Sequence, residues 1–79
     1  MTRLRLLTRP GCHLCDEMKA LVSTLAPEHQ VELVQVDITG HRELEQQFGN
    51  EIPVLLLGDE AIAKVRTTRQ TLLDRLSQK

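Results

Sequence analysis

Two cysteines, two residues apart, stand where a short apolar run gives way to a helical pattern. A leucine-rich run covers residues 4–7, Pro10-Gly11 interrupts it, and Cys12 and Cys15 open the helical segment. They are the only cysteines in 79 residues. This order limits the start of the chain to a strand, a tight turn and a helix. A thiol at such a helix start is favoured as the thiolate, the nucleophile of disulfide exchange, and the second thiol lies one turn along.

Length and composition predict a single domain covering residues 1–79. Apolar residues make up 41% of the chain, and Phe48 is its one aromatic residue, so the core is expected to be aliphatic. The formal net charge is −1 with both signs intermixed, which excludes the basic stripe of a nucleic-acid-binding protein.

The longest apolar run, residues 52–57, is far too short to span a membrane and is interrupted by Pro53. The first residues alternate Arg3 and Arg5 with leucines instead of forming the apolar stretch of a signal peptide. We therefore expect a cytoplasmic protein with no membrane or nucleic-acid partner. In a reducing compartment, a lone pair of cysteines indicates redox or metal chemistry more than a structural staple.

Apolar spacing predicts seven elements. Strands are expected at residues 3–8, 31–36, 52–57 and 60–65, and helices at 12–26, 41–48 and about 67–78. Pro27 is expected to end the first helix, Gly49 to follow the second, and Thr67 with Gln70 to form a capping box at the third.

The element order is thus β-α-β-α-β-β-α. The first β-α-β unit is expected to be parallel, and the short Gly58-Asp59 turn makes the last two strands antiparallel. The sequence predicts an α/β fold, with a small mixed four-stranded sheet and helices on both of its faces.

This pattern resembles the thioredoxin superfamily, and most closely its small glutaredoxin-like proteins. The resemblance covers essentially the whole chain. It depends on the Arg-Pro-Gly-Cys-His-Leu-Cys segment at 9–15, the Ile-Pro-Val segment at 52–54, and the element order. It implies a thioredoxin-like fold with sheet order 4-3-1-2 and strand 3 antiparallel to the others.

The resemblance also implies a cis-proline at Pro53, lying against the cysteine pair. The backbone N–H and C=O of Ile52 then face an extended thiol substrate and pair with it as an edge strand would. In function, the resemblance implies a thiol–disulfide oxidoreductase of glutaredoxin type. Cys12 is the expected nucleophile, and Cys15, more buried, is the expected resolving thiol.

Two neighbours of Cys12 are further candidates. Arg9 occupies the place where glutaredoxins often carry a lysine that meets a glutathione carboxylate, and an ordinary exposed arginine is the alternative. His13, if protonated, stabilises the Cys12 thiolate, and an exposed histidine of little effect is the alternative. Lys64 and Arg66 are candidates for lining the same groove, although surface charge is their simpler interpretation.

Two departures from typical glutaredoxins leave the reductant open. His13-Leu14 stands between the cysteines where those proteins have Pro-Tyr, and the Gly-Gly pair that approaches glutathione is absent from residues 63–68. We expect no bound cofactor and a monomer. Its partner is a disulfide-containing protein or glutathione, with glutathione or a reductase supplying the electrons.

Two other classes of function are open at this point. A metal-binding module would use Cys12, His13 and Cys15 with His29 or His41, although a structural zinc site usually takes four ligands from two clusters. A docking domain would use the fold without turnover. In such a docking domain, the Cys12 thiol would have an ordinary pKa of about 8.5.

Overall fold

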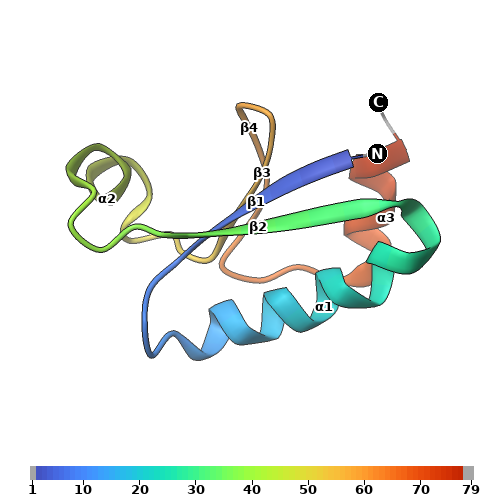
Figure 1. Cartoon of the computed structure of the whole chain (residues 1–79), viewed down its shortest axis with the longest axis horizontal. Coiled ribbons are helices and arrows are strands. Elements are labelled where there is room, and N and C mark those ends of the chain that lie inside the picture. The colour runs from blue at the N-terminus through green and yellow to red at the C-terminus, as the bar shows by residue number, and fades with distance from the viewer. Residues whose placement is uncertain (1, 78–79) are drawn as a thin grey trace.

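The computed structural model describes residues 2–77, apart from the side chains of residues 26–28, and forms one four-stranded sheet with three helices within that range (Figure 1). The elements are β1 (Thr2–Thr8), α1 (His13–His29), β2 (Val31–Asp37), α2 (Arg42–Phe48), β3 (Val54–Leu57), β4 (Glu60–Lys64) and α3 (Arg69–Ser77). The predicted element order is confirmed. No helix within the described range is long and apolar enough to cross a lipid bilayer.

The sheet has the order β2-β1-β3-β4, which is the predicted 4-3-1-2 order viewed from the other edge. Strand β1 is parallel to β2 and antiparallel to β3, and β4 is antiparallel to β3. Leu7 of β1 pairs with Val54, and Thr8 pairs with Asp37. The ends of β1 and β2 and the start of β3 therefore meet at one edge of the sheet, from which the turn before α1 departs.

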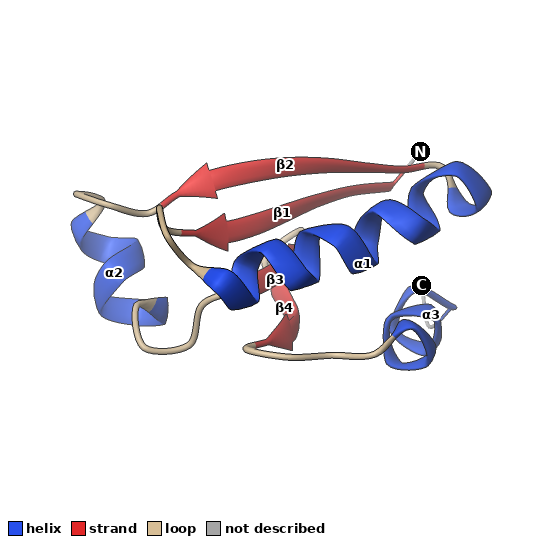
Figure 2. Ribbon diagram, turned by 90° about the horizontal axis from the view of Figure 1, so that it is seen from below, coloured by secondary structure: helices blue, strands red, loops and turns tan. Residues whose placement is uncertain are grey.

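The two faces of the sheet are covered differently. Helices α1 and α3 lie on one face, as Figure 2 shows for α1, and enclose the larger core. That core contains Leu4, Leu6, Met18, Val22, Leu25, Val31, Leu55, Ile62, Ala63 and Leu72. Helix α2 packs Leu44 and Phe48 on the opposite face, against a smaller cluster that includes Leu7 and Val54. The prediction of helices on both faces is confirmed.

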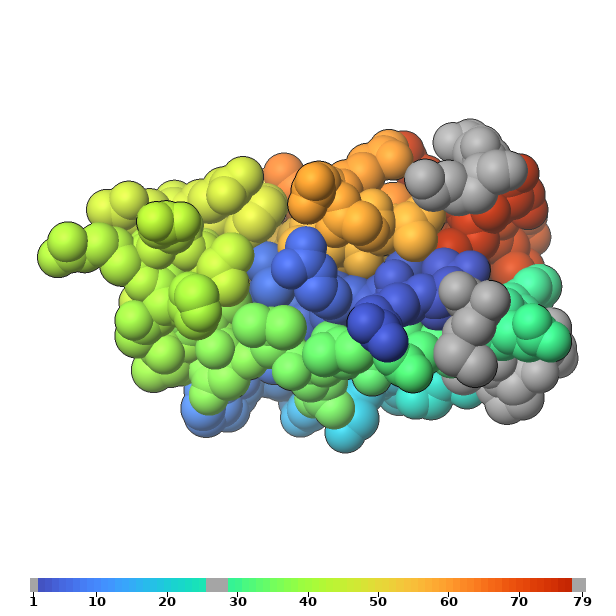
Figure 3. Space-filling model, turned by 45° about the horizontal axis from the view of Figure 1, so that its top comes forward, coloured from blue at the N-terminus to red at the C-terminus, as the bar shows by residue number. Residues whose placement is uncertain are grey.

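Helix α2 reaches only one end of its face. In Figure 3 it lies at the left, and the strands to its right remain at the surface. Strand period places Arg3 and Arg5 on this open part, because Leu4 and Leu6 point into the larger core. Arg3 pairs with Glu32 at 2.7 Å, and Arg5 donates to the Gly58 carbonyl at 3.0 Å.

The prediction that Pro27 ends the first helix is wrong, because α1 runs to His29. The fixed φ of proline lies in the helical range, and in a last turn the missing N–H removes one backbone hydrogen bond. Instead, the helix ends at Gln30, whose φ of 52° is left-handed. The Gln30 carbonyl then accepts the N–H of Thr2 at 3.0 Å.

The predicted capping box at the third helix is shifted by one residue. Thr68, not Thr67, is the cap: its Oγ1 accepts the N–H of Thr71 at 3.2 Å, and its carbonyl accepts that of Leu72 at 3.1 Å. Gln70 donates to Asp74 instead of returning to the cap. Both threonines are good caps, and only the path of the chain from β4 selects between them. The predicted end of this helix near 78 lies outside the described residues.

Smaller differences concern the segments around α2 and β3. Gly49 follows α2 as expected, but with a right-handed φ of −55°. A Cβ built there would overlap the Glu45 carbonyl oxygen and come within 3.1 Å of the Arg9 guanidinium, so close approach accounts for the glycine. Strand β3 begins at Val54, later than the predicted residue 52, because Pro53 has no N–H for a ladder.

Candidate functional site

Cys12 and Cys15 lie at the start of α1 and form a disulfide. Their Cα atoms are 5.2 Å apart, a usual separation for bridged cysteines. Cys12 is partly exposed, whereas Cys15 is 3% exposed and belongs to the core. The predicted order of exposure is confirmed.

Cys12 also takes the position of an N-cap. Its carbonyl accepts the first helical hydrogen bond, from the N–H of Asp16 at 3.3 Å. Its Sγ accepts the N–H of Cys15 at 3.1 Å, as the oxygen of a capping serine would. The N–H of Cys12 is bound by the Arg9 carbonyl at 3.3 Å. The Cys-x-x-Cys spacing therefore places one sulfur at the cap and the other one turn inside the helix.

The side chain of His13 points away from the protein. It is 90% exposed, and its Nε2 lies 3.7 Å from Oε2 of Glu17, one turn along the helix. Glu17 is the contact that the structure gives this ring, and it is an ion pair only when His13 is protonated. His13 thus adjoins Cys12 in the chain, as predicted, and its role toward the thiolate stays a prediction.

Arg9 pairs with a carboxylate of the protein itself. Its Nη2 donates to Oε1 of Glu45 in α2 at 3.2 Å, with both side chains a little over a third exposed. The absence of a Cβ at Gly49 leaves room for this guanidinium. Since the Arg9 carbonyl also holds the N–H of Cys12, this residue connects the turn before α1 to α2. Its predicted contact with a substrate carboxylate would have to compete with Glu45.

Asp37, at the end of β2, is also affected by the positive charge of Arg9. Its Oδ1 accepts the N–H of Thr39 at 2.9 Å. Hydrogen bonds from Thr39, with a smaller contribution from the positive charge of Arg9, lower the pKa of the Asp37 carboxyl below its usual 3.8. The carboxylate is therefore ionised at neutral pH and fixes the turn between β2 and α2.

Ile52 and Pro53 precede β3, at the sheet edge where β1 ends. The peptide bond between them is cis. Pro53 is fully buried, and Ile52 is partly buried against the smaller core cluster. Within the described residues, the backbone N–H and C=O of Ile52 have no backbone hydrogen-bond partner. Because Leu7 pairs with Val54, these two residues approach the end of β1 that leads to Cys12.

A tight turn at Val65 follows β4. The N–H of Val65 binds the Pro53 carbonyl at 2.8 Å, and the N–H of Arg66 binds the Lys64 carbonyl at 2.6 Å. Val65 has a φ of 63°, which is unfavourable for a β-branched residue. The hydrogen bond from Val65 joins this turn to Pro53, the residue that precedes β3. Lys64 strengthens this connection, with Nζ 2.8 Å from Oε2 of Glu51.

A groove of about 270 Å³ runs between α1 and this turn. Leu14, Glu17, Met18 and Leu21 line it from α1, and residues 65–67 line it from the turn. Leu14 lies between the two cysteines in the chain, so the groove adjoins the first turn of α1. We call this feature the α1–turn groove.

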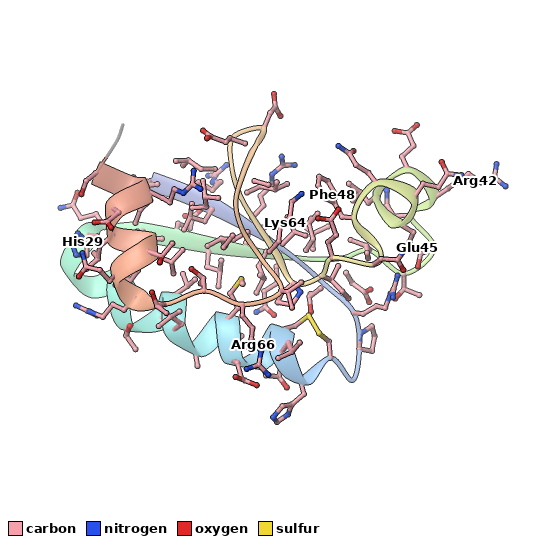
Figure 4. All side chains as sticks on the ribbon, turned by 180° about the vertical axis from the view of Figure 1, so that it is seen from behind. His29, Arg42, Glu45, Phe48, Lys64 and Arg66 are labelled. Carbon is pink, nitrogen blue, oxygen red and sulfur yellow. A yellow bond between two sulfur atoms is a disulfide. The ribbon has the colours of Figure 1, made fainter. Side chains whose placement is uncertain are left out.

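The residues proposed for a metal site do not come together. Within the described residues, no three histidine, cysteine, aspartate or glutamate side chains form a group fit to hold a metal ion. Figure 4 places His29 at the end of α1 remote from the disulfide. His41 precedes α2, on the other face of the sheet.

Sequence reasoning did not find Glu45 or the α1–turn groove. Glu45 is one of several charged residues on a short helix, and no local pattern identifies it as the partner of Arg9. Leu21, on the apolar side of the predicted first helix, is only partly buried and lines the groove. The left-handed turn at Val65 contains no glycine or asparagine, the residues from which such a turn is usually predicted.

A cysteine pair at the first turn of α1, together with a buried proline just before β3 of a mixed sheet, defines the thioredoxin-fold class. Similar solved structures support that class: a thioredoxin from Halobacterium salinarum shares 21% identity, covering 98% of this chain and 73% of that one, with a TM-score of 0.66. The solution structure of protein Ne2328 from Nitrosomonas europaea gives a TM-score of 0.84 at 26% identity. That match covers 94% of this chain and 89% of that one.

A match to one protein family gives a narrower assignment than the fold class. The Glutaredoxin-like domain (DUF836) matches residues 3–77, and the chain belongs to this glutaredoxin-like family. A glutaredoxin-like protein of Dictyostelium discoideum is 27% identical over 75 residues, and an uncharacterized protein of Mycobacterium tuberculosis is 32% identical over 60. These matches cover 87% and 70% of this chain, and 69% and 62% of those relatives.

Proposed function

We propose that the protein is a thiol–disulfide oxidoreductase of glutaredoxin type, with Cys12 as the nucleophile and Cys15 as the resolving thiol. The observation that carries this proposal is the position of Cys12: a partly exposed sulfur at a helix cap, bridged to a buried cysteine one turn along. Membership of the glutaredoxin-like family supports it.

The reduced protein starts the reaction with Cys12 as a thiolate. The N–H of Cys15, 3.1 Å from the Cys12 sulfur, and the helix dipole both stabilise the negative charge there. The Asp16 and Glu17 carboxylates near the start of the same helix oppose this stabilisation.

Cys12 Sγ attacks one sulfur of the substrate disulfide. A mixed disulfide forms, the substrate S–S bond breaks, and the other substrate sulfur leaves as a thiolate that takes a proton from water. Cys15, after losing its proton, attacks Cys12 Sγ and releases the second substrate thiolate. Two electrons pass to the substrate, and the protein is left with the Cys12–Cys15 disulfide. Two molecules of glutathione, or a dithiol reductase, supply the electrons that reduce it again.

The backbone of Ile52 is the proposed anchor for an extended substrate. Its N–H and C=O have no backbone partner within residues 2–77, so they are free to pair with a strand placed beside Pro53. Substrate binding is also assigned to Pro53, Arg9 and His13. For Arg9, that role requires exchange of Glu45 for a substrate carboxylate.

Reduction of a model disulfide tests the proposal. The wild-type protein with excess dithiothreitol or glutathione is expected to reduce hydroxyethyl disulfide, and Cys12→Ser is expected to abolish the reaction. Cys15→Ser is the matched control: incubated with hydroxyethyl disulfide and no added thiol, it is expected to keep the first step and to accumulate a mixed disulfide visible by mass spectrometry. Activity that survives in Cys12→Ser would end the assigned role. An unreactive wild-type Cys12 would favour a docking domain.

A further inference from the structure

We propose that an ion pair and a strained turn, both formed at the end of β4, position the backbone of Ile52 for an extended substrate. The positioning residues are Lys64, Glu51 and Val65. The proposal rests on the proposed function, in which Ile52 anchors the substrate, and it names what holds that anchor in place. Two separate links carry it: Lys64 to Glu51, and Val65 to Pro53.

The segment before β3 is held on both sides of Ile52. On one side, Glu51 donates its N–H to the Phe48 carbonyl, at the end of α2, over 2.8 Å. On the other side, the Pro53 carbonyl accepts the N–H of Val65 at 2.8 Å. Ile52 lies between these two bonds, and its own N–H and C=O have no backbone partner in the described part of the chain. The positions of its two neighbours therefore determine where these groups point.

An ion pair adds a second bond on the Glu51 side. Nζ of Lys64 lies 2.8 Å from Oε2 of Glu51, and both side chains are a little under half exposed. Lys64 is the last residue of β4 and pairs with Val54 in the β3–β4 ladder, so the sheet fixes its backbone. Figure 4 shows Lys64 in the same region as Phe48, where α2 ends. The ion pair thus joins a strand residue to the loop residue just before Ile52.

The turn at Val65 keeps an unfavourable conformation. A φ of 63° is costly for a β-branched residue, and the bond from the Arg66 N–H to the Lys64 carbonyl closes a γ-turn of the rare, strained form. Such strain persists where the surrounding structure holds it, and it is concentrated at functional sites. In this turn, the strained residue directs its N–H to the Pro53 carbonyl, just after Ile52.

The two links restrict the conformations that the Ile52 backbone can adopt before a substrate binds. An extended peptide that pairs with a fixed N–H and C=O does not have to order this segment on binding, so it binds more tightly. A small disulfide without a peptide backbone cannot use these groups. We therefore expect the links to favour protein substrates over small disulfides, with little effect on the chemical step at Cys12.

The ratio of two reaction rates tests the proposal in a Cys15→Ser parent. One substrate is the capped, neutral peptide acetyl-Ala-Ala-Cys-Ala-Ala-amide, joined by a disulfide to thionitrobenzoate, and the other is mercaptoethanol joined to it in the same way. The Cys12 thiolate attacks the peptide or mercaptoethanol sulfur, forms a mixed disulfide and expels the thionitrobenzoate thiolate, whose absorbance gives the rate. Mass spectrometry confirms which sulfur is attached to Cys12. Because thionitrobenzoate is the charged group of both substrates, a change of protein charge acts on both rates alike.

Removal of the ion pair is the first comparison. Glu51→Gln and Lys64→Gln are each expected to lower the peptide-to-mercaptoethanol ratio about threefold, the range of one exposed ion pair. Lys64→Arg keeps a cation within reach of Glu51 and is expected to retain the parent ratio. The matched control is Glu32→Gln, which breaks the ion pair with Arg3 at the opposite edge of the sheet and is expected to leave the ratio unchanged.

Val65→Pro tests the second link. Proline is apolar and close to valine in size, but it has no N–H and its φ is fixed at about −65°, so it can neither bind the Pro53 carbonyl nor form this turn. We expect the ratio to fall by about threefold or more, as for loss of one hydrogen bond. Urea denaturation shows whether this variant folds, and where it does not, the ion-pair variants decide the proposal.

A peptide methylated at the backbone nitrogens of both alanines beside its cysteine separates the links from the anchor. In the parent, methylation is expected to lower the ratio, because it removes the N–H that pairs with the Ile52 carbonyl, and its effect is expected to be smaller in Glu51→Gln. If methylation lowers the ratio but loss of the ion pair does not, the anchor stands and the role of the links is overturned.

The remaining outcomes also contradict the proposal, each in its own way. Equal losses of the peptide and mercaptoethanol rates in Glu51→Gln would mean that the ion pair acts on Cys12 or on the whole fold, and not on Ile52. A parent rate that methylation leaves unchanged would remove Ile52 as the anchor, and the links with it, while the redox function stands. A Cys12 that reacts with neither substrate would contradict the proposed function itself.

Discussion

Cys12 combines two tasks in one side chain. Its sulfur accepts a hydrogen bond at the start of α1, which stabilises the helix, and the same sulfur is the proposed nucleophile. An oxygen at that position would cap the helix but would not exchange disulfides. Arg9 connects the turn before Cys12 to the rest of the molecule. It contacts Glu45 and also helps to lower the pKa of Asp37.

Asp37 gives a pH-dependent prediction. Its pKa in the folded protein is lower than the value it has in the unfolded chain, chiefly because of the hydrogen bonds from Thr39. It therefore contributes stability above the unfolded pKa, and this contribution is lost as the pH falls through the folded pKa. Asp37→Asn is expected to lower the free energy of unfolding at pH 7, and the difference from wild type is expected to shrink below pH 3.8.

Urea denaturation at a series of pH values measures this difference. Asp59→Asn removes the same charge from the exposed turn between β3 and β4, and so controls for the change of net charge. A difference between wild type and Asp37→Asn that stays constant from pH 7 to the acid limb would show that the charge of Asp37 is not involved.

Most of the local differences between the predicted and the observed structure lie at the ends of helices. Helix α1 passes Pro27 and ends at a left-handed Gln30, and α3 begins after Thr68 although Thr67 is equally suited as a cap. In both cases, the residue types permit two solutions, and the position of the neighbouring strand selects one. Gly49 follows α2, as predicted. The reason for a glycine there is the close approach of the Arg9 side chain, and not a left-handed backbone conformation.

The cap of α3 gives a prediction with a matched control. Thr68→Ala removes the oxygen that accepts the Thr71 N–H and is expected to cost about 1 kcal/mol of folding free energy. Thr67→Ala removes an adjacent hydroxyl whose contact with the Thr68 carbonyl is long, 3.5 Å, and is expected to cost clearly less. Thermal or urea unfolding of both variants measures the difference. Equal losses would contradict the assignment of Thr68 as the cap.

At the scale of the whole molecule, the sheet order brings distant segments to one place. Strand β1 lies in the middle, so the turn before Cys12 meets the residues before β3 and, through Pro53, the turn after β4. The proposed site therefore consists of three segments that lie far apart along the chain. It depends on a small aliphatic core, because Phe48 is the one aromatic residue and packs on the smaller cluster.

Loss of one central leucine should therefore weaken the whole fold. Leu55 of β3 is completely buried between β1 and β4, and Leu55→Ala is expected to cost about 2–5 kcal/mol. For 79 residues, the total stability is roughly 4–12 kcal/mol. Val34→Ala in β2, where the side chain is 37% exposed, is the control and is expected to cost less than about 1 kcal/mol. Chemical denaturation gives both values, and comparable losses would contradict the core assignment.

The sequence by itself determined the elements, their order and the cysteine pair, because periodic apolar residues, turn residues and a Cys-x-x-Cys at a strand–helix junction are local signals. The sheet order came from resemblance to a family and was confirmed. Tertiary structure alone decided that Arg9 contacts Glu45, that Val65 turns against Pro53, and that Leu14 and Arg66 share a groove. These contacts join residues far apart in the chain, and their energies depend on distances that no local pattern encodes.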